Sequence, residues 1–170
     1  MDKKAPNSPQ RRNFIEKAVG VTAGLGLAAA TWPFIDSMNP TASDLSNATT
    51  RVNIEDIGVG DVKTVEWRGK PVFIFHRTPE QINNMQASMG SDIDPEPDAD
   101  RVKNPEWLVV VGLCTHLGCV PPKSPDGWRC PCHGSVFDNS GRVLRSPAPK
   151  NLVIPPYTFV AENEILIGEA

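Results

Sequence analysis

All four cysteines of this 170-residue chain lie between Cys114 and Cys132, and two of its three histidines lie among them. They form two short segments, CTHLGC at residues 114–119 (the first loop) and CPCHGS at residues 130–135 (the second loop). Each loop contributes two cysteines and one histidine. Cysteines clustered in this way indicate one site rather than a disulfide framework spread over the fold. The fold must therefore bring the two loops together.

Three kinds of site could use these six residues. Zinc takes four Cys or His ligands, which would leave two free thiols. Two disulfides would leave both histidines without a role. A 2Fe–2S cluster with mixed ligation takes two cysteines on one iron and two histidines on the other, and the spare cysteines can form a disulfide. Only the third scheme uses all six residues.

The rest of the sequence from residue 51 onward predicts a mainly β-sheet domain. The chain holds 17 prolines, which favour turns over a helical bundle. Short β-type runs alternate with turns, and Arg68-Gly69-Lys70 reads as a hairpin turn. Thr78, Pro79 and Gln81 form a helix start with a capping box, so a short helix is expected at about Pro79–Met89. The expected strands are Asp61–Trp67, Pro71–Phe75, Trp107–Val111, a segment around Val143, Leu152–Ile154, Tyr157–Val160 and Ile165–Ile167.

The N-terminal region has a different character. An uncharged, mostly apolar run extends from Ala18 to Ile35 and would span roughly 27 Å as a helix, close to a hydrocarbon core of about 30 Å. Basic residues precede it, and Arg11-Arg12 resembles a twin-arginine export signal. We therefore expect a cytoplasmic segment at residues 1–13, a transmembrane anchor at 14–37, a flexible linker at 38–50 and the β domain at 51–170. The alternative is a cleaved signal peptide, with the small residues Ala28–Ala30 as the cleavage region.

Charge argues against nucleic acid as a partner. Five of the 17 basic residues lie before Ala18, so 12 bases face 17 acids from Pro40 onward, a balance of −5. The acidic residues at positions 92–100 lack the spacing of an EF-hand and predict a solvated loop. The third histidine, His76, lies on an expected strand and reads as an ordinary structural residue.

The two loops resemble the motif of the Rieske iron–sulfur family, Cys-x-His-x-x-Cys with Cys-x-Cys-His. The resemblance extends from the anchor to Ser146-Pro147-Ala148-Pro149, which is similar to that family's proline loop. It implies an all-β Rieske domain of stacked antiparallel sheets with a cluster-binding subdomain at about 110–150. It also implies that Cys114 and Cys130 bind the inner iron, that His116 and His133 bind the outer iron, and that Cys119 and Cys132 form a disulfide. Ser135 is expected to donate a hydrogen bond to a cluster sulfide.

Within the family, the chain looks most similar to the iron–sulfur subunits of cytochrome bc complexes. The disulfide pair, the anchor, the CTHLGCVP form and the insertion at Thr78–Pro105 carry this resemblance. It implies a dimeric, proton-translocating respiratory or photosynthetic complex that contains cytochrome b and a c-type cytochrome. Quinol would meet His133, or His116, at the periplasmic side of a bacterial inner membrane, beside Leu117 at a docking surface. The alternative is the small subunit of an arsenite-oxidase-type molybdenum enzyme.

Two positions depart from the family pattern. Phe137 stands where members of the bc type carry a tyrosine, and Ser146 stands where the proline loop begins with glycine. Histidine ligation lowers the negative charge of the cluster and raises its potential to about −150 to +300 mV for the class. A missing tyrosine hydroxyl bears on that potential, and Ser146 bears on how closely the proline loop approaches the cluster.

Overall fold

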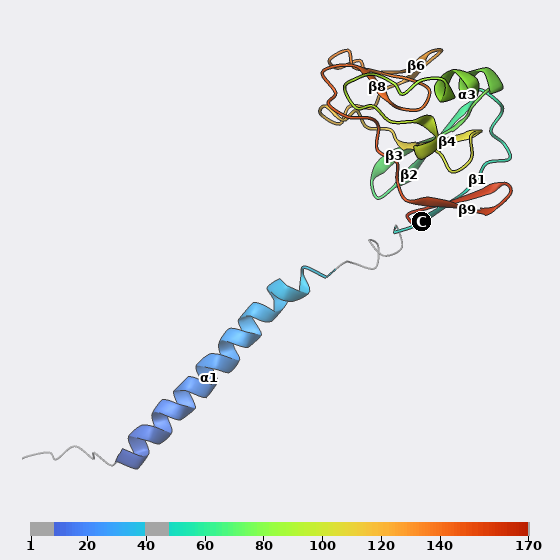
Figure 1. Ribbon diagram of the computed structural model, residues 1–170. Helices are drawn as coiled ribbons and strands as arrows, with labels where there is room; N and C mark the ends of the chain where they lie inside the picture. The colour runs from blue at the N-terminus through green and yellow to red at the C-terminus, as the bar shows by residue number, and fades with distance from the viewer. Residues whose placement is uncertain (1–8, 40–47, 170) are drawn as a thin grey trace, which may run out of the picture. The chain divides into compact units, whose positions relative to one another are not determined.

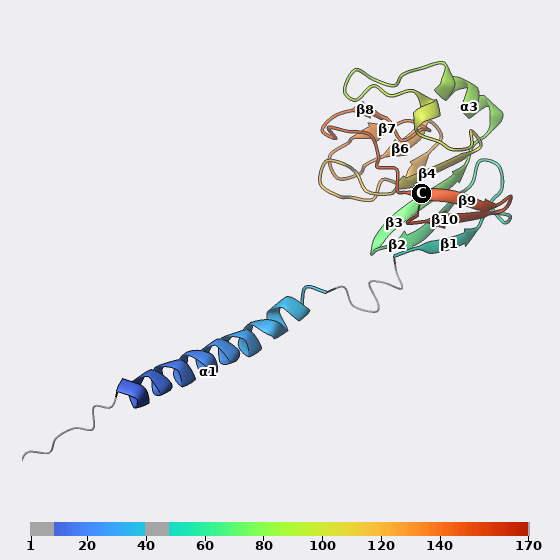
Figure 2. The same ribbon diagram turned by 60° about the horizontal axis from the view of Figure 1, so that its bottom comes forward.

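The computed structural model describes residues 9–39 and 48–169 (Figures 1 and 2). The expected twin-arginine segment is therefore described only from Pro9 onward. Of the expected linker, residues 40–47 lie outside the described residues. The chain divides into two units, Met1–Leu45 and Ser46–Ala170, and each is treated by itself below.

The first unit contains helix α1, Pro9–Asp36. At 28 residues it is about 42 Å long, and it is sufficiently long and apolar to cross a bilayer. None of its residues is buried, so its apolar side chains find no cover within the described chain. The hydroxyls of Thr22 and Thr31 donate to Ala18 O at 2.8 Å and Leu27 O at 3.0 Å. The helix thus satisfies its own hydroxyl groups, as an apolar medium requires.

The second unit is built of three antiparallel sheets, as the all-β prediction required. Figure 1 shows them stacked, with the sheet of β2, β3 and β4 in the middle. The lower sheet has the order β1 (Thr50–Asn53), β10 (Glu164–Ile167), β9 (Tyr157–Ala161), and the middle sheet the order β2 (Val62–Trp67), β3 (Lys70–His76), β4 (Trp107–Val111). The upper sheet has the order β5 (Lys123–Ser124), β6 (Gly127–Arg129), β7 (Val136–Phe137), β8 (Val143–Arg145).

Strands β3 and β4 of the middle sheet are buried on both faces. Successive side chains of a strand point to opposite sides, so each strand contributes to two cores. On β3, Val72 and Ile74 enter the core shared with the lower sheet, whereas Phe73 and Phe75 enter the core shared with the upper sheet. All five residues of β4 are buried. This explains why both strands read as continuous apolar runs rather than as alternating ones.

Local signals in the sequence correctly located the hairpin and the helix start. Arg68 and Gly69 have φ of 51° and 69°, so they make the two-residue turn between β2 and β3. Helix α3 (Pro79–Gln86) carries the expected capping box: the Gln81 amide donates to Thr78 Oγ1, and the Thr78 amide donates to Gln81 Oε1. A short 3₁₀ helix, η1 (Asp98–Asp100), follows.

One predicted helix end and one predicted strand are wrong. Helix α3 ends at Gln86 rather than Met89, because the Arg142 guanidinium takes the carbonyl oxygens of Met85 and Ser88, and Gly90 then turns the chain at φ +85°. Leu152–Ile154 forms no strand. Its backbone is shared between two neighbours, since Leu152 N donates to Gly141 O and Val111 N donates to Val153 O, each at 2.7 Å.

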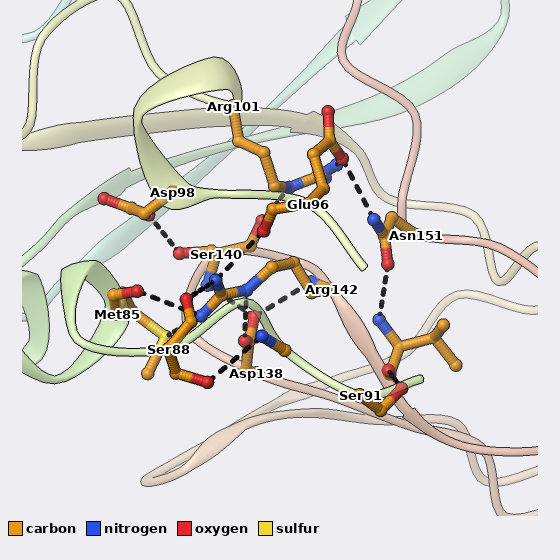
Figure 3. Close-up of polar contacts among 12 residues, drawn as sticks. Met85, Ser88, Ser91, Glu96, Asp98, Arg101, Asp138, Ser140, Arg142 and Asn151 are labelled. Atoms are coloured by element: carbon orange, nitrogen blue, oxygen red, sulfur yellow. Dashed lines mark hydrogen bonds and ion pairs between the residues drawn. The ribbon is translucent and has the colours of Figure 1, made fainter. Parts of the chain in front are cut away.

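The acidic residues at 92–100 are only partly solvated, which corrects the sequence prediction: Asp92 and Asp100 are exposed, but Asp98 is buried and Asp94 and Glu96 are half-buried. Together with residues 78–91 and 101–105 they form a segment that we call the acidic insertion. Three buried arginines tie it into the domain. Arg77 pairs with Asp98 of the insertion. Arg101, which pairs with Glu96 inside the insertion, donates to Ser140 O and Leu152 O outside it, and Arg142, which pairs with Asp138 outside the insertion, donates to Met85 O and Ser88 O inside it (Figure 3). The Arg77–Asp98 pair is fully enclosed and bidentate, with distances of 2.6 and 3.2 Å. Ser140 donates a further hydrogen bond to Asp98.

We predict that Asp98→Asn lowers the free energy of unfolding of the second unit by about 3–5 kcal/mol, because it leaves the Arg77 charge buried without a counter-charge. Asp100→Asn is the matched control, since Asp100 lies two residues away in the same 3₁₀ helix and is exposed. Denaturant unfolding of both variants measures the difference. Equal losses in the two variants would show that the buried ion pair contributes no more to the free energy of unfolding than an exposed carboxylate does.

Candidate metal centre

The two loops have the same backbone geometry. In the first loop, Cys114 N donates to Cys119 O and Gly118 N donates to Cys114 O, both at 2.8 Å. In the second loop, Cys130 N donates to Ser135 O at 2.8 Å and Gly134 N donates to Cys130 O at 3.1 Å. Gly118 and Gly134 have φ of 80° and 79°, a left-handed conformation that glycine adopts without strain. The two loops therefore close in the same way, from the first cysteine to the sixth residue, although the histidine is the third residue of the first loop and the fourth of the second.

The strands that hold the loops explain their position. The first loop follows β4 directly, and the second loop connects β6 to β7. Trp128 of β6 stacks on Phe73 of the middle sheet with ring centroids 4.7 Å apart. A Cβ at Gly127 would lie 2.0 Å from Phe137 O, so only glycine lets β6 run this close to β7. Packing against one sheet thus fixes both loops.

The histidine rings from the two loops meet. His116 Nδ1 lies 3.2 Å from His133 Nδ1, and the rings are nearly perpendicular with centroids 4.7 Å apart. His116 is half-buried, whereas His133 is exposed. Two nitrogen donors from separate loops are thus directed at one point, and the Nε2 atom of each ring lies on the opposite side.

The four cysteines divide into two pairs. Cys119 and Cys132 form a disulfide that joins the loops, with Cα atoms 6.6 Å apart, which confirms the predicted pairing. Cys114 and Cys130 keep free thiols and are buried, at 2% and 3% exposure. The sulfur of Cys130 lies within 4.8 Å of both disulfide sulfurs. A bonded disulfide has no thiolate to offer a metal, so distance alone does not make those three sulfurs a ligand set.

Burial raises the pKa of the Cys114 thiol above its ordinary value, and the neighbouring Cys130 acts in the same direction. Hydrogen bonds from the His116 amide and the Ser135 hydroxyl act against this rise. Two buried thiols side by side are unfavourable as thiolates unless a cation compensates their charge. The donor set of two buried sulfurs and two facing imidazole nitrogens fits a cluster that takes two ligands of each kind.

The proline segment, Ser146–Pro149, closes over the second loop. Ala148 is fully buried and its amide donates to Ser135 Oγ at 2.9 Å. The serine at position 146 therefore does not prevent a close approach. Just beyond this segment, Thr115 Oγ1 donates to Lys150 O at 2.6 Å, which links it to the first loop as well. Phe137 is fully buried and pairs with Trp128 in register.

The remaining predicted residues lie as follows. Leu117 is 71% exposed in the first loop, next to His116. His76 contacts Ile57 O through Nδ1 at 2.8 Å and stacks on Trp107 with centroids 4.1 Å apart, so it is a packing residue. The sequence reasoning missed Thr115 and Asn151, which hold the chain beyond the proline segment. Their partners are distant in sequence, and no local motif indicates them.

Comparisons with known proteins agree with this geometry. The family described as "Rieske [2Fe-2S] domain" matches residues 49–158, and "Ubiquitinol-cytochrome C reductase Fe-S subunit TAT signal" matches residues 1–41. The "Ubiquinol-cytochrome c reductase iron-sulfur subunit" of Rickettsia conorii is 49% identical over 164 residues, 93% of each chain. That of Rhodospirillum rubrum is 47% identical over 167 residues, covering 93% of this chain and 91% of the relative.

A solved structure is also similar. A chain of the "Hyperthermophilic respiratory Complex III" matches with a TM-score of 0.56 and 27% identity, covering 89% of this chain and 99% of that chain. The match therefore includes most of both chains and is not confined to the two loops.

Proposed function

Because this chain belongs to the Rieske [2Fe-2S] family, and within it to the iron–sulfur subunits of the ubiquinol–cytochrome c reductase type, we propose that it takes an electron from quinol and passes it to a c-type cytochrome. The chain carries one Rieske-type 2Fe–2S cluster. When bound, that cluster supplies a one-electron carrier whose potential is raised by histidine ligation. The similarity over 93% of both chains carries the proposal. It does not favour the arsenite-oxidase alternative.

The geometry supports the ligand set proposed from the sequence. Cys114 and Cys130 are the two free, buried thiols, so they hold the inner iron. His116 and His133 hold the outer iron through their facing Nδ1 atoms. Cys119 and Cys132 tie the loops together instead of binding metal. Ser135 is fully buried between these ligands and the proline segment.

His133 is the residue we assign to quinol contact, because it is the more exposed of the two histidines. With Nδ1 directed toward the other loop, Nε2 faces outward and accepts a hydrogen bond from the quinol hydroxyl. The same nitrogen then takes the hydroxyl proton as quinol is oxidised. Leu117, exposed next to His116 in the first loop, provides an apolar contact for the quinol.

We place the chain in a bacterial inner membrane with the β domain on the periplasmic side. In this arrangement residues 1–13 stay in the cytoplasm, residues 14–37 of the apolar helix span the bilayer, and residues 38–50 connect to the domain at 51–170. The partners are cytochrome b and a c-type cytochrome, in a complex that we propose to be dimeric. A β domain connected to the membrane helix by a flexible linker can contact both partners in turn.

Purification of the native membrane complex through a tag on this chain tests the function. We expect cytochrome b and a c-type cytochrome as companions, together with quinol–cytochrome c reductase activity. A His133→Ala complex serves as the control and should assemble without that activity. Recovery of a molybdopterin subunit instead would overturn the assignment.

The ligand set predicts the iron content of variants. His116→Ala or Cys130→Ala should leave no cluster, because the two other cysteines are held in the disulfide and cannot replace a lost ligand. Cys119→Ser should retain a more labile cluster. His76→Ala is the matched control and should bind iron normally, since His76 packs on Trp107. Iron and acid-labile sulfide per chain are the measurements. Loss of iron in Cys119→Ser with retention in Cys114→Ser would reverse the assignment.

Phe137 predicts a lower potential than that of tyrosine-bearing relatives. A tyrosine hydroxyl at this position would donate a hydrogen bond to the Cys114 sulfur and favour the reduced state. One such bond is worth about 0.5–1.5 kcal/mol, or roughly 20–65 mV for a one-electron couple. We therefore expect Phe137→Tyr to raise the midpoint potential by that amount, measured by voltammetry. Phe159→Tyr, a change in the other core, is the control and should leave the potential unchanged. A potential that stays level or falls in Phe137→Tyr contradicts the prediction.

A further inference from the structure

The chain just after the proline segment lies between two parts of the domain. On one side, Ala148 N donates to Ser135 of the second loop, and Lys150 O accepts from Thr115 of the first loop. On the other side, Asn151 contacts the acidic insertion. The short segment 148–151 is therefore the place where both loops and the insertion are connected.

Asn151 makes four hydrogen bonds, three of them to the insertion and one to strand β8. Its backbone N donates to Asp94 Oδ2 at 2.9 Å, and its side-chain Nδ2 donates to Asp94 O at 3.0 Å and to Glu96 Oε2 at 2.9 Å. Its Oδ1 accepts from Val143 N of strand β8 at 2.8 Å. Figure 3 shows the side chain between Glu96 and β8. An amide is required here, because the position needs two donors and one acceptor on one side chain.

The partners of Asn151 are themselves fixed. Glu96 Oε2 also accepts from Arg101, and the same guanidinium donates to Leu152 O at 2.7 Å, next to Asn151. Arg101 is 3% exposed, so this ion pair is shielded from solvent on the arginine side. The residue after the proline segment is thus tied to a rigid part of the insertion rather than to a loop free to move.

Ser135 is the point at which this connection reaches the metal centre. Its Oγ accepts a hydrogen bond from Ala148 N and is fully buried. One lone pair of the hydroxyl is therefore occupied by the Ala148 amide, and its hydrogen must be directed away from Ala148. A shift of Ala148 would release the hydroxyl to rotate.

We propose that Asn151 is a positioning residue that holds Ala148 in place and thereby fixes the direction in which the Ser135 hydroxyl donates its hydrogen bond. This inference rests on the proposed function, because it concerns the environment of the same cluster. It assigns to the acidic insertion, 50 or so residues away in the sequence, a part in setting the redox potential.

The test compares Asn151→Ala with Asn139→Ala in the full chain in detergent. Both asparagines are 6% exposed and lie in the same region of the domain, but Asn139 bonds to Lys123 Nζ and Pro125 O instead of the insertion. In Asn151→Ala we expect a lower midpoint potential and exchange of the Ala148 amide that is about tenfold faster. In Asn139→Ala we expect neither. Equal shifts in the two variants, or no shift in Asn151→Ala, would overturn the inference.

A double-mutant cycle with Ser135→Ala tests the path of the effect. Once the hydroxyl is absent, adding Asn151→Ala should lower the potential no further. Additive shifts would show that Asn151 acts elsewhere and would overturn the proposal. Should Asn151→Ala fail to fold, Asp94→Ala takes its place in the cycle, because it removes the acceptor for Asn151 N and leaves the Glu96 and Val143 bonds.

Iron and sulfide analysis separates the two levels of the argument. A wild-type chain without a 2Fe–2S cluster would overturn the proposed function. A wild-type chain with a full cluster, combined with additive shifts in the cycle, would overturn only the role of Asn151.

Discussion

The structure depends on strand β3 being buried on both faces. Its even-numbered side chains fill the core below and its odd-numbered ones the core above, so the strand belongs to both layers. Trp128 stacks on Phe73 of this strand, and β4, its neighbour, runs directly into the first loop. Both loops are therefore positioned by the same rigid strand, β3. The two histidines can face each other at 3.2 Å because neither loop sets its own position.

The disulfide and the repeated loop geometry have separate structural roles. The backbone hydrogen bonds and the left-handed glycines shape each loop individually. The Cys119–Cys132 bond then fixes one loop relative to the other. The sequence made this much predictable, because both the motif spacing and the cysteine pairing are local features that belong to a known family. The hairpin turn and the helix start were predictable for the same reason.

The acidic insertion was not predictable in this way. A run of carboxylates between prolines looks the same whether water or buried arginine surrounds it, and the arginines here lie at positions 77, 101 and 142, far apart in the chain. The end of helix α3 failed for a related reason, since it is set by Arg142 and not by its own sequence. Leu152–Ile154 reads as a strand because it is apolar. Its backbone instead completes the edges of two other segments.

Three buried arginines hold the insertion where apolar residues could have served: Arg77 through the Asp98 carboxylate, and Arg101 and Arg142 through backbone carbonyl oxygens. Buried ion pairs contribute little net stability relative to well-packed apolar groups, but each one tolerates only one arrangement of its partners. Apolar packing would allow the insertion to slide, whereas a bidentate arginine–carboxylate pair does not. If the potential of the metal centre depends on single hydrogen bonds, a fixed position of the surrounding residues matters more for it than added fold stability. The network of buried charges, with Asn151 at its edge, is suited to supply that position because a small displacement would leave a charge unpaired.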